Sequence, residues 1–274
     1  PISNYTNVRA VLYDNKRNIV YAGSTGEFGY YQLDPITSQL IYKSISSYLP
    51  PKEKDFSEIW NIYHCNNNII FQGKNNFFIY KSDGTLQNKK EKYRIESSAC
   101  INDRIIFTAK EGVFEIVNGY TYELPGTDLL KGLTVRSIMP YGRNILFATS
   151  SNGIFIYNGV SVKEFKMDIT PLLKEYQIFC TTINDRYIAF GTVRGGLIVK
   201  DLKSGNTTYA NTTTGLQNNT VLSLKFDKLN NIWIGLDNGI SYMLLNTPYR
   251  ELLGERNSIG TGYTSIIYKG KLYL

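Results

Sequence analysis

The chain has 274 residues, of which 42% are hydrophobic and 19% are charged, so it can bury a core and is not a disordered tract. Its 22 Tyr and 13 Phe favour strands, because these side chains suit a pleated, half-buried surface. A net charge of +7 would suit a polyanion only if Lys and Arg were clustered, and they are scattered, which argues against direct nucleic-acid contact. The densest charged run, 89–96, is interpreted as a solvated loop.

Paired short strands recur along the whole chain. In chain order they lie at 19–31, 69–81, 105–117, 145–158, 187–201 and 232–244, and a seventh begins at 271–274. Each contains an aromatic residue that we predict as a core anchor: Tyr21, Phe71, Phe107, Phe147, Phe190, Trp233 and Tyr273. A period of about 40 residues built from short strands is typical of a β-propeller.

One unit illustrates the expected blade. A first strand at 220–226 is followed by a turn, a second strand at 232–235, an Asp-Asn-Gly turn and a third strand at 240–244. Looser fourth strands are expected in other units, as at 163–166 and 207–210. The predicted fold is therefore all-β, a single propeller domain over 1–274 with six four-stranded antiparallel blades and the start of a seventh.

The ring expected from this count has seven blades, with six as the alternative. Because a propeller closes by bringing its last blade against its first, the partial seventh unit predicts a portion of a longer protein. No apolar run is long enough to span a bilayer, and Pro1 opens directly into polar sequence, so a soluble portion is expected whose signal or anchor could lie outside it.

The run GLQNNTVLSLKFDKLNNIWIGLDNGISYM at 215–243 resembles the two-component regulator propeller repeat. Eleven positions carry the resemblance: Gly215, Leu216, Val221, Asp227, Ile232, Trp233, Ile234, Gly235, Asn238, Gly239 and Tyr242. The stretches GEFGYY at 26–31 and KDFSEIWNIY at 54–63 are similar to the N-terminal blades of such sensors. The resemblance implies a periplasmic propeller that responds to a glycan and is followed in the same polypeptide by a triple-tyrosine domain and a kinase or DNA-binding output.

The three cysteines, Cys65, Cys100 and Cys180, are too far apart in sequence for a disulfide framework or a metal cluster. They are interpreted as small buried side chains, with a Cys65–Cys100 bridge as the alternative. The sole histidine, His64, is interpreted as a packed or surface residue. No hydrolase, zinc or phosphate-loop motif occurs, so no catalytic residue, metal or cofactor is predicted.

The sequence supports ligand binding better than it supports catalysis. In a propeller, the loops that enter each first strand and the turns between second and third strands meet at one face. The predicted ligand residues on these segments are Arg9, Trp60, Glu96, Arg136, Phe179 and Arg194. Lys74, Lys110, Asn152 and Asp237 are weaker candidates. Arg and Trp suit a saccharide or acidic ligand, through forked hydrogen bonds and ring stacking, whereas the alternative is that they only pack between blades.

The predicted function is a non-enzymatic, extracytoplasmic sensor of a bacterial signal-transduction regulator. Its expected partners are an oligosaccharide or other small molecule, a second copy of the chain, and the downstream domains. The alternatives are a scaffold for protein–protein interaction and, behind it, a propeller lyase or glycosidase.

Overall fold

The structure of the chain is a computed structural model that describes residues 2–246 and 264–273. The chain forms two compact units, Pro1–Ile178 and Phe179–Leu274. Apart from the helix α1 (Thr170–Tyr176) and three short 3-10 helices, regular structure in the described residues is all strand. The predicted all-β class is confirmed, while the single domain over 1–274 stays a prediction.

The first unit contains four sheets of four antiparallel strands each, in which every strand pairs with its neighbour in sequence. The first sheet consists of β1 (Ala10–Asp14), β2 (Ile19–Gly23), β3 (Phe28–Leu33) and β4 (Leu40–Ser44). The second consists of β5 (Asn61–Cys65), β6 (Asn68–Gln72), β7 (Asn76–Tyr80) and β8 (Leu86–Lys90). Between them lie the 3-10 helices Ser46–Tyr48 and Pro51–Glu53.

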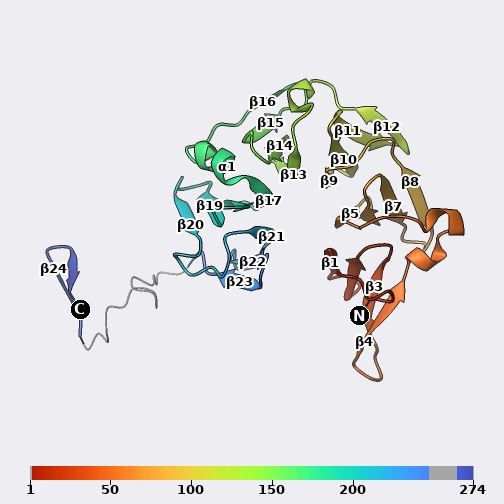
Figure 1. Ribbon diagram of the computed structural model, residues 1–274, viewed down its shortest axis with the longest axis horizontal. Helices are drawn as coiled ribbons and strands as arrows, with labels where there is room; N and C mark the ends of the chain where they lie inside the picture. The colour runs from red at the N-terminus through yellow and green to blue at the C-terminus, as the bar shows by residue number, and fades with distance from the viewer. Residues whose placement is uncertain (1, 247–263, 274) are drawn as a thin grey trace. The chain divides into compact units, whose positions relative to one another are not determined.

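The third sheet consists of β9 (Ser97–Ile101), β10 (Arg104–Ala109), β11 (Gly112–Val117) and β12 (Tyr120–Glu123), followed by the 3-10 helix Asp128–Leu130. The fourth consists of β13 (Val135–Tyr141), β14 (Asn144–Thr149), β15 (Ile154–Tyr157) and β16 (Val162–Glu164), followed by α1. The first strands β1, β5, β9 and β13 lie beside one another in succession, so the four sheets are successive blades (Figure 1).

The second unit continues the same pattern. One four-stranded sheet consists of β17 (Ile178–Ile183), β18 (Tyr187–Thr192), β19 (Leu197–Asp201) and β20 (Thr207–Ala210). A three-stranded sheet follows, with β21 (Val221–Phe226), β22 (Ile232–Leu236) and β23 (Ile240–Met243). A separate hairpin joins β24 (Ile266–Tyr268) to β25 (Lys271–Tyr273), at the place where a seventh blade is predicted to begin.

Apolar side chains from adjacent sheets fill the space between blades. In the first unit, Phe71, Phe107 and Phe147 are fully buried, and Tyr21 is almost so. Each such ring contributes about 1.5–3 kcal/mol through removal of its surface from water. These four anchors, together with the buried Phe190 of the second unit, are confirmed as core residues.

Trp233 and Tyr273 differ from the prediction, because half of the surface of each is exposed. For Trp233, the register explains why. Phe71 and Phe147 pair with Ile62 and Ile138, which directly follow Asn61 and Ser137 in the first strands of their blades. The corresponding residue of β21 is Ser223, and Trp233 pairs with Lys225, two positions after it. Since side chains alternate across a sheet, this single step places Trp233 on the opposite face, and the buried residue at the equivalent position is Ile234.

A disulfide joins Cys65, at the end of β5, to Cys100 in β9, with their Cα atoms 5.4 Å apart. The alternative prediction of a Cys65–Cys100 bridge is therefore confirmed, and Cys65 is buried as predicted, whereas Cys100 is only partly buried. Cys180 is a free thiol whose pKa is raised to about 12 by burial. The bridge ties the first strands of two adjacent blades.

Candidate ligand-binding site

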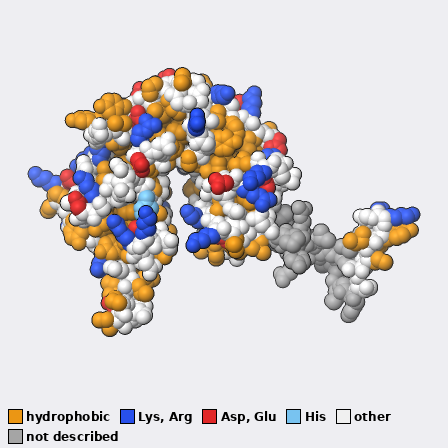
Figure 2. Space-filling model, turned by 180° about the vertical axis from the view of Figure 1, so that it is seen from behind, with side chains coloured by type: hydrophobic (Ala, Val, Ile, Leu, Met, Phe, Trp, Pro, Cys, Tyr) orange, Lys and Arg blue, Asp and Glu red, His pale blue; other side chains and the backbone are white. Residues whose placement is uncertain are grey.

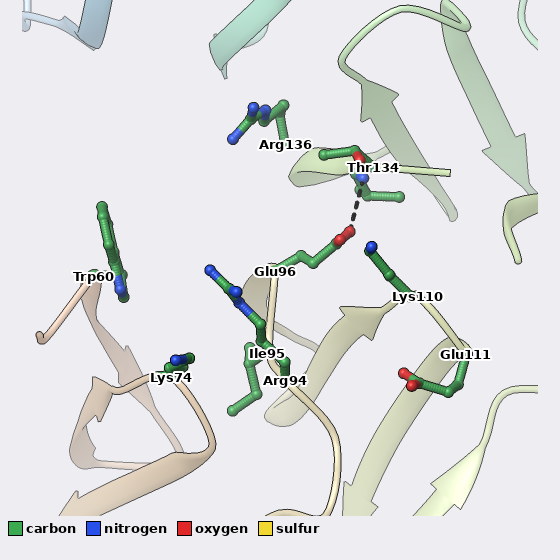
Figure 3. A pocket seen from close by; sticks show the side chains of 10 residues that line it. Trp60, Lys74, Arg94, Ile95, Glu96, Lys110, Glu111, Thr134 and Arg136 are labelled. Atoms are coloured by element: carbon green, nitrogen blue, oxygen red, sulfur yellow. Dashed lines mark hydrogen bonds between the residues drawn. The ribbon is translucent and has the colours of Figure 1, made fainter. Parts of the chain in front are cut away.

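A cavity of about 410 Å³ opens at the ends of blades two, three and four in the first unit. Its volume is within the range of small-molecule sites. We call it the Trp60 cavity, and it is lined by Trp60, Lys74, Arg94, Ile95, Glu96, Lys110, Glu111, Thr134, Val135 and Arg136. In Figure 3, Trp60 stands on one side of the cavity, and Arg94 points into the space between Trp60 and Arg136.

The cavity wall consists of two kinds of segment that hydrogen bonds hold together. Ile95, in the loop that enters β9, donates its N–H to the carbonyl oxygen of Lys74 in the β6–β7 turn, at 2.8 Å. Gly132, in the loop that leads to β13, donates in the same way to Lys110 in the β10–β11 turn, at 2.8 Å. The turn of each blade is thereby fixed to the entrance of the next, as the propeller geometry predicts.

Three predicted site residues enter their strands in the same way. Arg9, Trp60 and Glu96 donate their backbone N–H groups to Gly23, Gln72 and Thr108 of the neighbouring second strand, at 2.9, 2.8 and 2.8 Å. Arg136 takes the corresponding place in the fourth blade, within a register shift of β13 between Val135 and Ser137. A bulge redirects a side chain from its regular position, which suits a residue at the rim of a cavity.

The position of Trp60 is fixed by the residue before it in the chain and by a contact with Arg9. The preceding residue, Ile59, is fully buried against Gly23, where an added Cβ would lie 2.5 Å from the Ile59 side chain. The guanidinium carbon of Arg9 lies 5.0 Å from the centroid of the Trp60 ring, and Arg9 also pairs with Glu58 at 3.8 Å. The indole is therefore fixed by a cation–π contact while half of its surface stays accessible.

Glu96 is partly buried in the wall of the cavity. Burial raises the pKa of its carboxyl group, and this effect outweighs the Val135 N–H, which donates to Oε2 at 3.3 Å, and the nearby charges of Arg136, Lys110 and Arg94, which all lower it. Figure 3 shows that hydrogen bond as a dashed line. An incoming anion would compete with the Glu96 carboxylate for this donor and these cations.

Of the six predicted ligand residues, Trp60, Glu96 and Arg136 line the cavity, and Arg9 stacks on Trp60. Phe179, in β17, and Arg194, in the β18–β19 turn, belong to the second unit, where Arg194 is exposed. Arg94 was not among the predicted ligand residues, because the charged run at 89–96 was interpreted as a solvated loop. The signal that could have found it is its place two residues before Glu96, in the loop that enters β9.

A second cavity, of about 700 Å³, lies at the other ends of the strands of blades one and two, where Asp14, Arg17 and His64 line it. The single His side chain is seen beside Lys and Arg side chains in Figure 2. Asp14 accepts the N–H groups of Lys16 and Arg17, and Arg17 donates to Tyr21, so these groups already serve the local turn. His64 is exposed, as one of its two interpretations requires.

No helix among residues 2–246 and 264–273 has the length and apolar character needed to cross a bilayer. No family model matches the chain, and no curated protein is similar to it in sequence. The likeness is instead to solved structures.

Two structures of the extracellular domain of BT4673 from B. thetaiotaomicron, described as a one-component system in one and a hybrid two-component system in the other, are similar with TM-scores of 0.67. Their identities are 17% and 16%, each match covers 89% of this chain, and the chain spans 33% of that domain.

The WD40 propeller domain of Doa1 has a TM-score of 0.64 at 10% identity, with 88% of this chain and 79% of that chain covered. PorZ of Porphyromonas gingivalis, described as a surface component of the type-IX secretion system, has a TM-score of 0.61 at 12% identity, with 88% and 32% covered. At these identities the likeness concerns the fold, and the fold of this chain is a β-propeller like that of the extracellular domains of bacterial regulators.

Proposed function

We propose that this chain is a non-enzymatic, extracytoplasmic sensor module of a bacterial signal-transduction regulator and that it binds a saccharide in the Trp60 cavity. The observation that carries the proposal is the cavity itself, which joins an exposed indole to four Lys or Arg side chains at the end of three blades. Aromatic rings stack on the apolar faces of sugar rings, and guanidinium groups donate paired hydrogen bonds to sugar oxygens.

The location outside the cytoplasm is supported by the Cys65–Cys100 disulfide, since such bonds persist in oxidising compartments and are rare in the cytosol. The proposed route of the signal is through further domains of the same polypeptide, by analogy with the BT4673 regulator, whose extracellular domain is similar in fold. Pairing of two copies through the propeller would bring two such outputs together, which light scattering of the purified chain would detect.

The function can be tested with the chain of 274 residues and a panel of oligosaccharides. A ligand that binds only the folded state stabilises it by about 2.7 kcal/mol at 100 times its dissociation constant, so thermal unfolding shows a clear shift. We expect one sugar class to produce this shift, and Trp60→Ala to remove it. Lys163→Ala, an exposed substitution in β16, is the control and should leave the shift intact.

Absence of any stabilising sugar would contradict the sensor proposal and favour the protein-interaction scaffold. Turnover of a polysaccharide that is lost on Glu96→Gln or Glu111→Gln would instead favour a lyase or glycosidase.

A further inference from the structure

The Trp60 cavity carries an excess of positive charge. Four of its lining side chains are cationic, Lys74, Arg94, Lys110 and Arg136, and two are acidic, Glu96 and Glu111. The formal balance is therefore four minus two, or +2, within one small concave site. Concave walls concentrate such a field, so an anion is attracted more strongly here than at a flat surface.

Three of the four cationic side chains of the cavity form no ion pair with another described residue. Among the ion pairs of the described residues, none involves Lys74, Arg94 or Lys110. All three side chains belong to exposed residues at the cavity wall. Elsewhere in this unit, Lys and Arg side chains do find carboxylates, as Arg104 does with Glu115 at 2.7 Å. The cavity therefore keeps cations that an acidic ligand could engage.

Glu96 shows which groups of the cavity interact with a carboxylate. Its Oε2 takes the Val135 N–H at 3.3 Å, and the charges of Arg136, Lys110 and Arg94 all act on it. A carboxylate or sulfate group brought by a ligand would meet the same donors. It would also be repelled by Glu96, so the protein's own anion competes with the ligand for them.

The Trp60 indole adds a flat apolar surface beside these charges. Arg9 contacts the ring at 5.0 Å, and half of the side chain remains exposed. A free inorganic anion would use the cations but not the indole, whereas a sugar ring that carries an acidic group would use both.

We propose that the Trp60 cavity selects an anionic saccharide, a sugar ring with a carboxylate or sulfate group, and that Glu96 is the internal competitor that weakens its binding. The inference rests on the proposed sensor function and names its ligand class. Lys110 and Arg136 bind the acidic group, and Trp60 stacks against the ring.

The test is calorimetric titration of the 274-residue chain with matched pairs of sugars. Trigalacturonate is compared with its methyl ester, which removes the charge and keeps the rings, and galactose 6-sulfate is compared with galactose. We expect the charged member of at least one pair to bind about tenfold more tightly, the factor that one charge-assisted hydrogen bond supplies, and the preference to shrink as salt is added.

Three variants locate the effect. Lys110→Ala and Arg136→Ala should each reduce the affinity for the charged sugar about tenfold and leave that for its neutral partner nearly unchanged. Glu96→Gln should raise the affinity for the charged sugar only. The matched controls are Arg143→Ala, an exposed arginine in the β13–β14 turn, and Glu175→Gln, an exposed glutamate in α1; neither should change binding. Unchanged melting temperatures show that the variants fold.

The possible results contradict different parts of the proposal. Equal or tighter binding of the neutral sugars overturns the anionic ligand and leaves the sensor function standing. Binding of sulfate or acetate alone as tightly as the sugars overturns the saccharide. Failure of every sugar, charged or neutral, overturns the sensor function as well.

Discussion

The guanidinium carbon of Arg9 lies 5.0 Å from the centroid of the Trp60 ring, so a residue of the first blade holds the aromatic side chain of the second.

Trp60 and Trp233 are the two tryptophans of the chain. In a Trp233→Phe background, Trp60 alone reports on the cavity by fluorescence. We expect a saccharide to shift its emission to the blue, because stacking removes the indole from water, and Arg9→Ala to diminish that shift. Tyr120→Ala, at an exposed residue of β12, should have no effect.

Reduction of the Cys65–Cys100 bridge should destabilise the first unit. The bridge closes a loop with a sequence separation of 35, for which chain entropy gives about 3–4 kcal/mol. We expect dithiothreitol to lower the free energy of unfolding by that amount in urea titrations. The double variant Cys65→Ala/Cys100→Ala is the control, since it should be insensitive to the reductant. If dithiothreitol lowered the free energy of unfolding of the double variant as much as that of the unmodified chain, its effect would not arise from the Cys65–Cys100 bridge.

Anion binding should strengthen as the solution is acidified. The pKa of Glu96 is raised above its ordinary value of 4.5 by burial, so its carboxylate gains a proton earlier on acidification than an exposed glutamate would. Protonation removes the repulsion between Glu96 and an acidic ligand. Galactose 6-sulfate is the suitable probe, because its own charge does not titrate in this range.

The Glu96→Gln variant separates this effect from Glu111, the other carboxylate of the cavity. Its affinity should be high already at pH 7 and should change less on acidification than that of the unmodified chain. A full pH dependence retained in Glu96→Gln would assign the titration to a different group.

Tyr242→Phe should raise the pKa of Asp227. The Tyr242 hydroxyl donates to Asp227 Oδ2 at 2.6 Å, and this hydrogen bond is the main reason why the pKa of Asp227 lies below its ordinary value of 3.8. A lowered pKa means that the carboxylate stabilises the fold above pH 3.8 and that this contribution is lost as the pH falls through the lower folded value. Carboxyl NMR titration would measure the change. Asp34, whose pKa is lowered mainly by the Thr37 N–H, is the internal reference and should not move.

Glu27→Gln should destabilise the first blade. Glu27 Oε1 accepts hydrogen bonds from the hydroxyl groups of Tyr42, Ser44 and Ser46, at 3.0, 2.7 and 2.7 Å. Loss of the charge weakens all three, at an expected cost of about 1–3 kcal/mol in the free energy of unfolding. Denaturant titration would measure it, with Glu175→Gln as the exposed control. A change below about 0.5 kcal/mol, typical of a surface substitution, would contradict this role.

Much of the fold follows from periodicity in the sequence. The strands predicted at 220–226 and 240–244 are β21 and β23, and the fourth strands predicted at 163–166 and 207–210 correspond to β16 and β20. The burial of Trp233 was wrongly predicted, because the aligned repeat motifs do not show whether an aromatic residue is shifted by one position in the strand. Only strand pairing shows which face it occupies.

The candidate site was harder to predict. Equivalent positions in the repeats pointed to Trp60, Glu96 and Arg136, because a shared backbone position fixes where a side chain emerges. Arg94 was not found, since the run at 89–96 has the composition of a solvated loop. In the structure, Lys89 of that run forms an ion pair with Glu91 at 3.1 Å. Arg94 lines the Trp60 cavity.

The order of strands within each sheet bears on how the chain acquires its structure. In every described sheet, each strand is hydrogen-bonded to the strand next to it in sequence, so no sheet needs a distant segment to be complete. Loop closure between such neighbours is entropically cheap, and proteins dominated by short-range contacts fold quickly for their class. Each sheet can therefore complete its strand pairing from one continuous segment of the chain, whereas core residues such as Tyr21 and Phe71 become buried only when two adjacent blades are present.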